Sequence, residues 1–281
     1  MTASPGFMIG LIGSGIAASR TPAMHMAEGA RQGMGYDYNR IDLTALGLSA
    51  KALPTLLAEA KSQGYNGLNI THPCKQAVIP LLDELSSDAL AIGAVNTVVI
   101  RGARTTGHNT DWWGFRDGFM RGLPNADLSD VLQLGAGGAG SAVAYALKKM
   151  GARNLMIFDI DSSKADALAA QLNAHFGSGT TAVADPATAA ARATGLVQTT
   201  PIGMDAHPGM PIPAEAIDPH HWCAEIIYFP LETEFLRQAR AKGCRIVDGS
   251  GMAVGQAVRA FELFTGVMPD AEAMRTTLFA A

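Results

Sequence analysis

Cysteines are few in this chain, and metal-binding patterns are missing from it. The 281 residues include three cysteines, Cys74, Cys223 and Cys244, which are scattered and lack the spacing of metal ligands. The histidines form no HExxH motif, and the adjacent His220 and His221 are expected to point apart. Without a GxSxG or a CxxC sequence, neither a serine hydrolase nor a dithiol redox enzyme is supported. The scattered cysteines favour a reduced, cytoplasmic compartment.

Positive charge and long apolar runs are also limited. Lys and Arg total 21 against 25 Asp and Glu, a net charge of −4, so no basic surface argues for a nucleic acid partner. The apolar stretches are short and interrupted by Gly, Pro or charge, so no membrane partner is expected. The N-terminal Met-Thr-Ala-Ser-Pro-Gly sequence lacks the basic and apolar regions of a signal peptide. At 48% apolar residues, the chain can bury one large core or two modest ones.

Strand-like and helix-like segments alternate, which predicts an α/β fold with mostly parallel strands. Thr21 is expected to cap a helix with Pro22 at its first position, and Ser49 to start a helix that ends before Gly64. A further helix is expected to open at Pro73 and to carry Lys75 in its first turn. The expected strands of this region are Phe7–Ile12, Tyr36–Asp42, Tyr65–Ile70 and Ala94–Ile100, with a hairpin return over Thr105–Asn109.

The most informative feature is a glycine-rich turn, Gly135-Ala-Gly137-Gly-Ala-Gly140, between the apolar run Val131–Leu134 and the helix-forming run Ser141–Met150. Gly135 permits a tight turn, Gly137 lets the backbone approach a pyrophosphate, and Gly140 lets helix and strand pack closely. The phosphates would lie at the positive end of the helix. The sequence therefore predicts a Rossmann-type, doubly wound dinucleotide-binding domain.

Asp159 follows the next predicted strand, Asn154–Phe158, near the offset of about 20 residues that this fingerprint expects. A carboxylate there accepts hydrogen bonds from both hydroxyls of an adenosine ribose and repels a 2′-phosphate. Ile160 and Asp161 follow, with no arginine, and Lys164 comes only later, so NAD is predicted rather than NADP. In the structural alternative, Asp159 only caps the helix that begins near Ser162.

About 110 residues precede the first nucleotide-binding strand, which is enough for a domain of their own. Trp112–Arg121 reads as a connecting helix, and the second domain is expected to run to about Val247. The last helical stretch, Met252–Phe264, could belong to either domain.

Polar side chains collect near the ends of the predicted strands in the first domain. In open α/β sheets, ligands bind outside the carboxyl ends of the strands, so these residues are expected to line one wall of a cleft. Their hydroxyl, amide and charged groups suit a small, polyhydroxylated anion. Individually, each could equally be a cap, a turn residue or a solvated charge. The set comprises Ser19, Thr21, Asn69, Thr71, Lys75, Asn96, Asn109 and Asp111.

With its flanking residues, this set resembles the shikimate/quinate dehydrogenase family over essentially the whole chain. The Asn-x-Thr-x-Pro-x-Lys and Asn-Thr-Asp-x-x-Gly elements are the specific ones. The segments that carry the resemblance, in the family's order, are Ser19-Arg-Thr21-Pro-Ala-Met-His25, Asn69-Ile-Thr71-His-Pro73-Cys-Lys75, Gly93-Ala-Val-Asn96-Thr97, Gly107-His-Asn109-Thr110-Asp111-Trp-Trp-Gly114, Gly135–Gly140, Thr200-Pro-Ile-Gly-Met204 and Gln256-Ala257.

The resemblance implies a substrate-binding domain over residues 1–111 and about 250–281, and an NAD-binding domain over 112–249. Lys75 and Asp111 would be the catalytic pair, with Lys75 accepting the hydroxyl proton. Ser19, Thr21 and Tyr228 would hold the substrate carboxylate, and the ring hydroxyls would meet Asn69, Thr71, Asn96 and Gln256. The implied cofactor-binding residues are Gly135, Ala136, Gly137, Gly138, Ala139, Gly140, Asp159, Lys164, Thr200, Pro201, Gly203, Met204, Gly249 and Met252.

Several positions depart from the family's usual pattern. Thr21 stands where the biosynthetic enzymes have serine, Gln198 replaces an asparagine, and Glu225 stands where many members have aspartate. Asp159-Ile-Asp161 replaces the Asn-Arg-Thr of the NADP-dependent branch and is similar to the NAD-linked quinate/shikimate branch.

The expected reaction is the reversible, NAD-dependent oxidation of a ring hydroxyl of shikimate, giving 3-dehydroshikimate, and of quinate. The expected partner is a small cyclic hydroxycarboxylate, and the protein is expected to be a monomer or homodimer. Alternatives are an aminoshikimate dehydrogenase of the same family, a non-catalytic dinucleotide- or quinate-responsive regulator, and a two-domain NAD dehydrogenase acting on amino acids or a folate.

Overall fold

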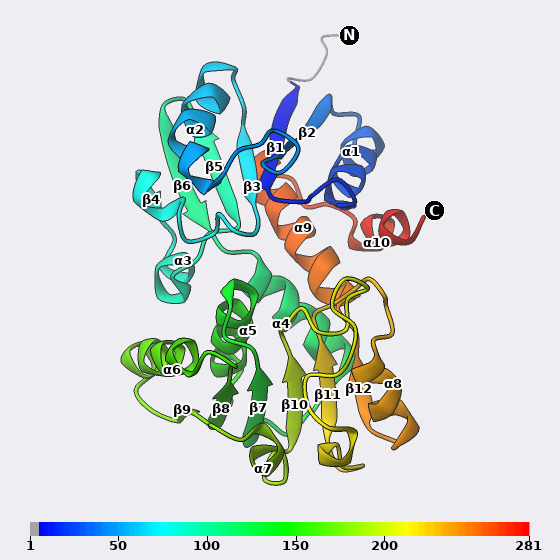
Figure 1. Cartoon of the computed structure of the whole chain (residues 1–281). Helices are drawn as coiled ribbons and strands as arrows, with labels where there is room; N and C mark the ends of the chain where they lie inside the picture. Colours follow the sequence, from blue (N-terminus) through cyan, green and yellow to red (C-terminus); the bar gives the residue numbers. More distant parts are fainter. Residues whose placement is uncertain (1–5, 281) are drawn as a thin grey trace. The chain divides into compact units, whose positions relative to one another are not determined.

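The computed structural model describes residues 6–280, and the chain divides into two compact units. The first unit comprises Met1–Thr110 and Gln256–Ala281, and the second comprises Asp111–Gly255. Each unit is built on a six-stranded sheet with helices packed against it (Figure 1). The predicted α/β architecture with two sheets is therefore confirmed.

The sheet of the first unit is mixed, in the order β2-β1-β3-β5-β6-β4. β1 pairs in parallel with both β2 and β3, whereas β5 runs antiparallel to β3 and β6. The strands are β1 (Phe7–Gly13), β2 (Tyr36–Asp42), β3 (Gly67–Ile70), β4 (Glu84–Leu85), β5 (Thr97–Arg101) and β6 (Arg104–His108). The predicted β2 boundaries and the predicted hairpin are both observed.

Apolar side chains bury both faces of this sheet. Leu53 and Leu57 pack on one face with Leu68 and Val98, and Phe261 and Phe264 pack on the other with residues of β1 and β2. The helices that begin in this unit are α1 (Thr21–Arg31), α2 (Leu53–Ser62), α3 (Ser87–Ile92) and α10 (Ala271–Phe279), with short 3₁₀ turns η1 (Ala50–Ala52) and η2 (Ile79–Leu81).

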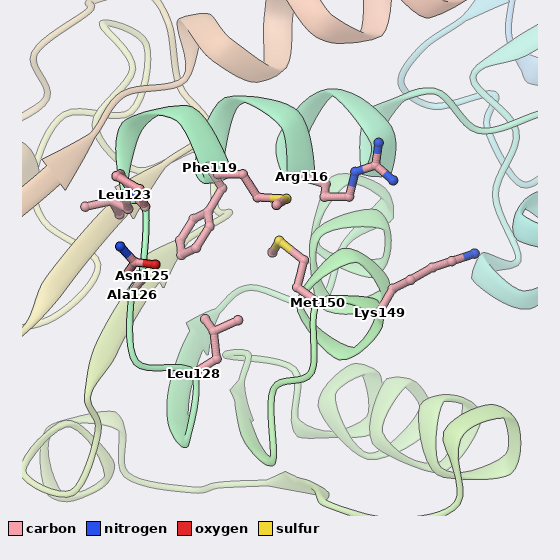
Figure 2. A pocket seen from close by; sticks show the side chains of 10 residues that line it. Arg116, Phe119, Leu123, Asn125, Ala126, Leu128, Lys149 and Met150 are labelled. Atoms are coloured by element: carbon pink, nitrogen blue, oxygen red, sulfur yellow. The ribbon is translucent and has the colours of Figure 1, made fainter.

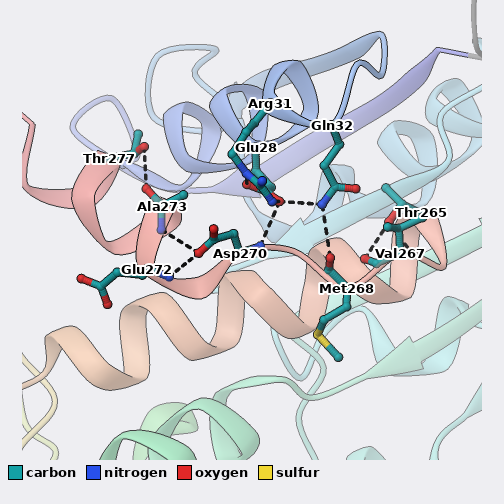
Figure 3. Close-up of polar contacts among 10 residues, drawn as sticks. All are labelled: Glu28, Arg31, Gln32, Thr265, Val267, Met268, Asp270, Glu272, Ala273 and Thr277. Carbon is teal, nitrogen blue, oxygen red and sulfur yellow. Dashed lines mark hydrogen bonds and ion pairs between the residues drawn. The ribbon is translucent and has the colours of Figure 1, made fainter.

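The C-terminal segment belongs to the first unit because polar contacts fasten it to α1 (Figure 3). The buried Glu28 accepts a hydrogen bond from the backbone N–H of Asp270 at 2.9 Å. Gln32, the C-cap residue of α1, donates to the carbonyl of Met268 at 3.2 Å. The preceding helix, α9 (Ser250–Thr265), crosses the boundary between the units at residues 255 and 256. This helix therefore contributes to both units, which the sequence left open.

The sheet of the second unit is entirely parallel, in the order β12-β11-β10-β7-β8-β9. Counted from β7, this is the 3-2-1-4-5-6 order of the doubly wound dinucleotide-binding fold, with its switch point between β7 and β10. The strands are β7 (Asp130–Leu134), β8 (Asn154–Phe158), β9 (Thr180–Ala182), β10 (Gly195–Gln198), β11 (Trp222–Glu225) and β12 (Arg245–Val247).

Helices cover both faces of this second sheet. Phe235 and Leu236 of one helix pack with Leu132 and Leu196 on one face. On the other face, Phe119 meets Trp222 edge-on, with their ring centroids 4.9 Å apart. The helices are α4 (Asp111–Gly122), α5 (Gly138–Lys149), α6 (Ser162–Phe176), α7 (Pro186–Ala190) and α8 (Glu234–Ala241), with a 3₁₀ turn η3 (Ala214–Ala216).

Two predicted helix starts in the first unit are wrong. Arg20, not Thr21, is the N-cap of α1, and Thr21 is its first residue. No helix opens at Pro73: the chain forms turns at residues 72–73 and 75–78 before η2. Backbone bonds between residues three apart shape this segment: the N–H groups of Cys74 and Ile79 bond the carbonyls of Thr71 and Gln76. Lys75 therefore lies in a turn and not in the first turn of a helix.

The two adjacent histidines also differ from expectation. The rings of His220 and His221 do not point apart, because their centroids are 4.2 Å apart. His220 bonds Asp218 through Nδ1 and the carbonyl of Ala193 through Nε2, and His221 bonds the carbonyl of Ala190. The pair thus ties the end of α7 to the segment before β11.

No helix within residues 6–280 combines the length and apolar character needed to cross a membrane.

Candidate active site

Strand register brings the polar residues of the first unit to one edge of its sheet. Asn69 is paired with Thr97, and Thr97 with His108, so the end of β3, the start of β5 and the end of β6 coincide. β1 and β3 are parallel neighbours, so the loops that follow both strands also leave from this edge. The structure therefore places Ser19, Thr21, Asn69, Thr71, Lys75, Asn96 and Asn109 around the same edge.

Asn69 and Asn96 are almost fully buried and belong to one hydrogen-bond network. Asn69 Oδ1 accepts from the Tyr38 hydroxyl at 2.7 Å, and its Nδ2 donates to Thr97 Oγ1 at 3.0 Å and to the Asn96 carbonyl at 3.3 Å. Asn96 Oδ1 accepts from the backbone N–H of Thr110 at 2.7 Å. These two side chains therefore have fixed positions at the sheet edge.

Backbone bonds bring Lys75 to the same place. Its carbonyl accepts from the N–H of Val95 at 2.9 Å, and the N–H of Asn96 bonds the carbonyl of His108 at 3.1 Å. The turn that carries Lys75 and the segment that leads to Asp111 therefore both border the Asn96 turn. Ser19 is held by its carbonyl, which accepts from Arg40 at 2.8 Å.

In the second unit, the predicted glycine turn joins β7 to α5. Gly135 has a φ of +104°, which favours glycine, and a Cβ on Gly140 would lie 2.6 Å from the carbonyl oxygen of Gly135. Gly137 is the N-cap of α5, and a Cβ there would meet nothing within 4 Å. The helix starts at Gly138, earlier than the predicted Ser141, so the N–H groups of its first turn lie within the glycine turn. This is the arrangement that binds an anion at a helix N-terminus.

Two side chains that sequence reasoning missed hold this turn. The fully buried Gln133 donates to the carbonyls of Gly135 and Gly140, both at 2.9 Å. Thr199 Oγ1 lies within bonding distance of the carbonyls of Leu134 at 2.8 Å and Gly135 at 2.9 Å. The sequence signal that could have found Gln133 is its polar side chain within the otherwise apolar strand β7.

Asp159 directly follows β8 and contacts the glycine turn. Its Oδ2 accepts from the N–H of Ala136 at 2.8 Å, and its Oδ1 accepts from the N–H of Asp161 at 2.9 Å. The N-cap of α6 is Asp161, so the alternative that Asp159 caps this helix is excluded. Lys164 pairs with Asp161 at 3.5 Å, rather than with the glycine turn.

The side chain of Gln198 forms hydrogen bonds with the backbone of the segment after β10. Its Oε1 accepts from the N–H of Thr200 at 2.8 Å, and its Nε2 donates to the carbonyl of Ile202 at 2.6 Å. Since β10 is the neighbour of β7, Thr200, Pro201, Gly203 and Met204 lie at the same carboxyl edge as the glycine turn.

A third group of the second unit surrounds the end of β11. The charge of Asp111, the first residue of α4, acts on the Tyr228 hydroxyl, and burial and this charge raise the pKa of Tyr228. Burial also raises the pKa of Glu225 to about 8, although its carboxyl accepts from the N–H groups of Ile226 and Ile227 and from Thr233. Glu225 thereby shapes the loop that carries Tyr228. Gly249 joins this group, because its N–H bonds the carbonyl of Ile227 at 3.2 Å.

The predicted site residues on α9 are Met252 and Gln256, both partly buried. His72, which follows Thr71, is exposed, and burial and the charge of Arg259 lower the pKa of His108 at the end of β6. No cluster of His, Cys, Asp and Glu suited to a metal ion occurs in the part of the chain that the structure describes.

A separate groove of about 450 Å³ lies between the end of α4, the linker after it and the end of α5 (Figure 2). It is lined by Phe119, Leu128, Met150 and other mainly apolar side chains. The glycine turn is at the start of α5 and the groove is at its end, roughly 18 Å away for twelve residues at the usual helical rise. This groove is therefore not part of the predicted dinucleotide site.

The sheet order, the glycine turn and the acid after β8 define a dinucleotide-binding α/β protein with a second α/β unit. Comparison with known proteins identifies the family. Residues 11–98 match the shikimate dehydrogenase substrate binding domain, and residues 249–279 match the shikimate 5′-dehydrogenase C-terminal domain.

Similar proteins cover nearly the whole chain. A shikimate dehydrogenase (NADP(+)) of Streptomyces avermitilis is 54% identical over 95% of this chain and 93% of its own length. A quinate/shikimate dehydrogenase (NAD(+)) of Corynebacterium efficiens is 50% identical over 96% of both chains. The solved structure of quinate dehydrogenase from Corynebacterium glutamicum in complex with NAD superposes with a TM-score of 0.93 at 49% identity, over 98% of this chain and 99% of that one. The chain belongs to the shikimate dehydrogenase family and is an oxidoreductase, as the sequence motifs predicted.

Proposed function

We propose that this protein catalyses the reversible, NAD-dependent oxidation of a ring hydroxyl of shikimate, and of quinate, to the corresponding ketone. The observation that carries the proposal is the position of Asn69 and Asn96 at one sheet edge, set by strand register, with the turn of Lys75 joined to that edge by the backbone bond from Val95 to Lys75. Amides, hydroxyls and one ammonium are groups that bind a polyhydroxylated carboxylate. The relatives named above are enzymes for substrates of this kind.

The preference for NAD rests on Asp159. A carboxylate has about four acceptor positions, and the backbone donors of Ala136 and Asp161 use one on each oxygen. An acceptor position remains on each oxygen for the two ribose hydroxyls, while the negative charge repels the 2′-phosphate of NADP. Ile160, which is 93% exposed, offers an apolar side chain beside this carboxylate for an adenine ring.

The glycine turn fits the pyrophosphate of such a cofactor. The open space at Gly137 and the first-turn N–H groups of α5 are where two phosphates could approach the backbone. Gly135–Gly140 and Asp159 would bind the adenosine half, and Thr200, Pro201, Gly203, Met204, Gly249 and Met252 would border the nicotinamide half. Lys164 would contact the cofactor only after leaving Asp161.

In the proposed mechanism, Lys75 accepts the proton of the hydroxyl that is oxidised and returns it in the reverse direction. Hydride acceptance is the chemistry that a bound nicotinamide supplies. Asp111 would partner Lys75: it follows Thr110, whose backbone N–H bonds Asn96 at the edge that Lys75 borders. Ser19, Thr21 and Tyr228 would hold the substrate carboxylate, while Asn69, Thr71, Asn96 and Gln256 would hold the ring hydroxyls.

The domain roles follow from this assignment. Residues 1–111 and about 250–281 would form the substrate domain, and 112–249 the NAD domain. The first boundary between the observed units differs from the predicted one by one residue. The second observed boundary lies within α9.

A matrix of initial rates tests the proposal. Shikimate, quinate and 3-aminoshikimate would each be supplied with NAD and with NADP, and the absorbance of the reduced nicotinamide would be followed. We expect turnover of shikimate, of quinate or of both, faster with NAD at equal concentrations. Faster turnover with NADP would contradict the role of Asp159, and preference for 3-aminoshikimate would favour the amino branch. Cofactor binding without turnover of any substrate would indicate a regulator instead.

A further inference from the structure

We propose that Tyr38 is a positioning residue that, together with the backbone carbonyl of Asn96, holds Asn69 with its side-chain oxygen as a hydrogen-bond acceptor toward the substrate, so that the ring substituent facing Asn69 must be a donor. The inference rests on the proposed function, because it concerns the substrate side of the same site. Tyr38 belongs to no motif of the family resemblance and is a buried residue of β2.

The first step is that the hydrogen bonds around Asn69 form a chain with one direction. The Tyr38 hydroxyl donates to Asn69 Oδ1 at 2.7 Å, and Asn69 Nδ2 donates to Thr97 Oγ1 at 3.0 Å. Thr97 Oγ1 in turn donates to Asn96 Oδ1 at 3.0 Å, and Asn96 Nδ2 donates to Thr110 Oγ1 at 3.0 Å. In this series, each hydroxyl or amide donates a hydrogen bond to the next residue. The Thr110 hydroxyl also lies 3.3 Å from Thr97 Oγ1 and 3.3 Å from Asn96 Oδ1, so the threonine hydroxyls have more than one arrangement and the orientation of the two amides depends on other partners.

The second step is that backbone groups pin this direction. The carbonyl of Asn96 can only accept, and it faces Asn69 Nδ2 at 3.3 Å. The backbone N–H of Thr110 can only donate, and it faces Asn96 Oδ1 at 2.7 Å. The oxygen and nitrogen of both side-chain amides are therefore identified by partners whose roles cannot change.

The third step concerns what remains of Asn69 for a ligand. Both hydrogens of Nδ2 are used, by the Asn96 carbonyl and by Thr97, and Tyr38 occupies one acceptor position of Oδ1. Asn69 has one more acceptor position and no further donor. Because Asn69 and Tyr38 are only 4% and 6% exposed, water has little access with which to relax this arrangement. A hydroxyl or an amine can donate to that oxygen, whereas a fluorine, an ether or a ketone oxygen would repel it.

The consequence is a stated substrate class at this position. Oxidation of shikimate at hydroxyl 3 leaves hydroxyls 4 and 5 to be bound by the ring-holding residues. One of these two hydroxyls bonds Asn69. Its replacement by fluorine should lower kcat/KM by about 100-fold or more, since fluorine leaves the buried Asn69 oxygen without a donor. Replacement by an amine should be tolerated within about 10-fold.

Two variants test the role of Tyr38. Tyr38→Phe removes only the hydroxyl, and its matched control is Tyr36→Phe, since the Tyr36 hydroxyl lies on the same strand but bonds His25 at 2.8 Å. Tyr38→Phe should lower kcat/KM for shikimate by about 10-fold, mainly through KM, because one of the bonds that orient a ring-holding side chain is lost. Tyr36→Phe should stay within about twofold of the parent, although it also loses a buried hydrogen bond.

Equal use of the 4-fluoro, 5-fluoro and parent compounds would overturn the proposal, as would equal kinetics of the two variants. A readout without turnover separates this result from failure of the proposed function. In NMR spectra, the side-chain amide protons of Asn69 can be assigned through their loss in Asn69→Asp. In the parent protein these protons should exchange slowly with solvent. Their chemical shifts should change in Tyr38→Phe but not in Tyr36→Phe. Fast exchange in the parent protein would contradict the inference, whether or not the enzyme turns over shikimate. If the parent turns over no substrate but this pattern holds, only the proposed function fails.

Discussion

The stability of the first unit should depend on pH through His25. This side chain is fully buried on α1, bonds the Tyr36 hydroxyl at 2.8 Å through Nδ1, and is enclosed by the rings of Tyr36, Tyr38, Phe261 and Phe264. Burial lowers its pKa from 6.5 to about 3. Between these two values the unfolded chain binds a proton that the folded protein does not, so falling pH favours unfolding.

The expected size follows from about 1.4 kcal/mol for each unit of pH below 6.5. From neutral pH to about pH 4.5, the parent protein should lose about 3 kcal/mol of unfolding free energy through this group. His25→Gln keeps a polar partner for Tyr36 and cannot titrate. The variant is expected to be less stable at neutral pH, and the gap to the parent should shrink by about 3 kcal/mol at pH 4.5.

Urea unfolding followed by circular dichroism measures this gap. Tryptophan fluorescence would not serve, because Trp112, Trp113 and Trp222 all lie in the second unit. His220→Gln is the control with opposite sign, since the hydrogen bond to Asp218 raises the pKa of His220. The stability that His220 adds is present below its unfolded pKa and is lost as pH rises through its folded pKa. A gap for His25→Gln that stays constant within about 0.5 kcal/mol would refute the reasoning.

Three further predictions concern the site. Lys75→Ala should lower turnover by about 10²–10⁴-fold while calorimetry still shows NAD binding, and near-parent turnover would rule out its acid/base role. Asp159→Ala should weaken the use of NAD and narrow its advantage over NADP in kcat/KM; an unchanged ratio would count against the ribose contact. Gly137→Ala should leave the melting temperature of the ligand-free protein unchanged, because a Cβ there meets nothing within 4 Å, yet weaken NAD binding. Unaltered affinity would show that the pyrophosphate does not approach this residue.

Local signals predicted much of the second unit. The glycine spacing, the apolar run before it and the acid after the next strand concern residues close together in sequence, and the β8 boundaries agree with prediction. Prediction failed after β3, where Pro73 suggested a helix start but the chain forms turns that lead into η2. The extent of a helix depends on bonds four residues apart, so a starting signal alone does not determine it.

The residues that hold the site were less accessible to sequence reasoning. Tyr38 and Asn69 are 31 positions apart, and Asn69 and Thr97 are 28 apart, yet they bond because β2, β1, β3 and β5 follow one another in one sheet. Gln133 offered a weak signal as a polar residue in an apolar strand, but its two partners lie across the turn.

By itself, the sequence determined the alternation of strands and helices, the glycine turn and the types of polar group available to a ligand. These depend on backbone preferences and on side-chain chemistry, which act within a few residues. Strand order and register decided which of those groups meet, and in which direction each hydrogen bond runs. Only the tertiary structure could settle that, because a buried amide takes its orientation from partners that the folded sheets bring to it.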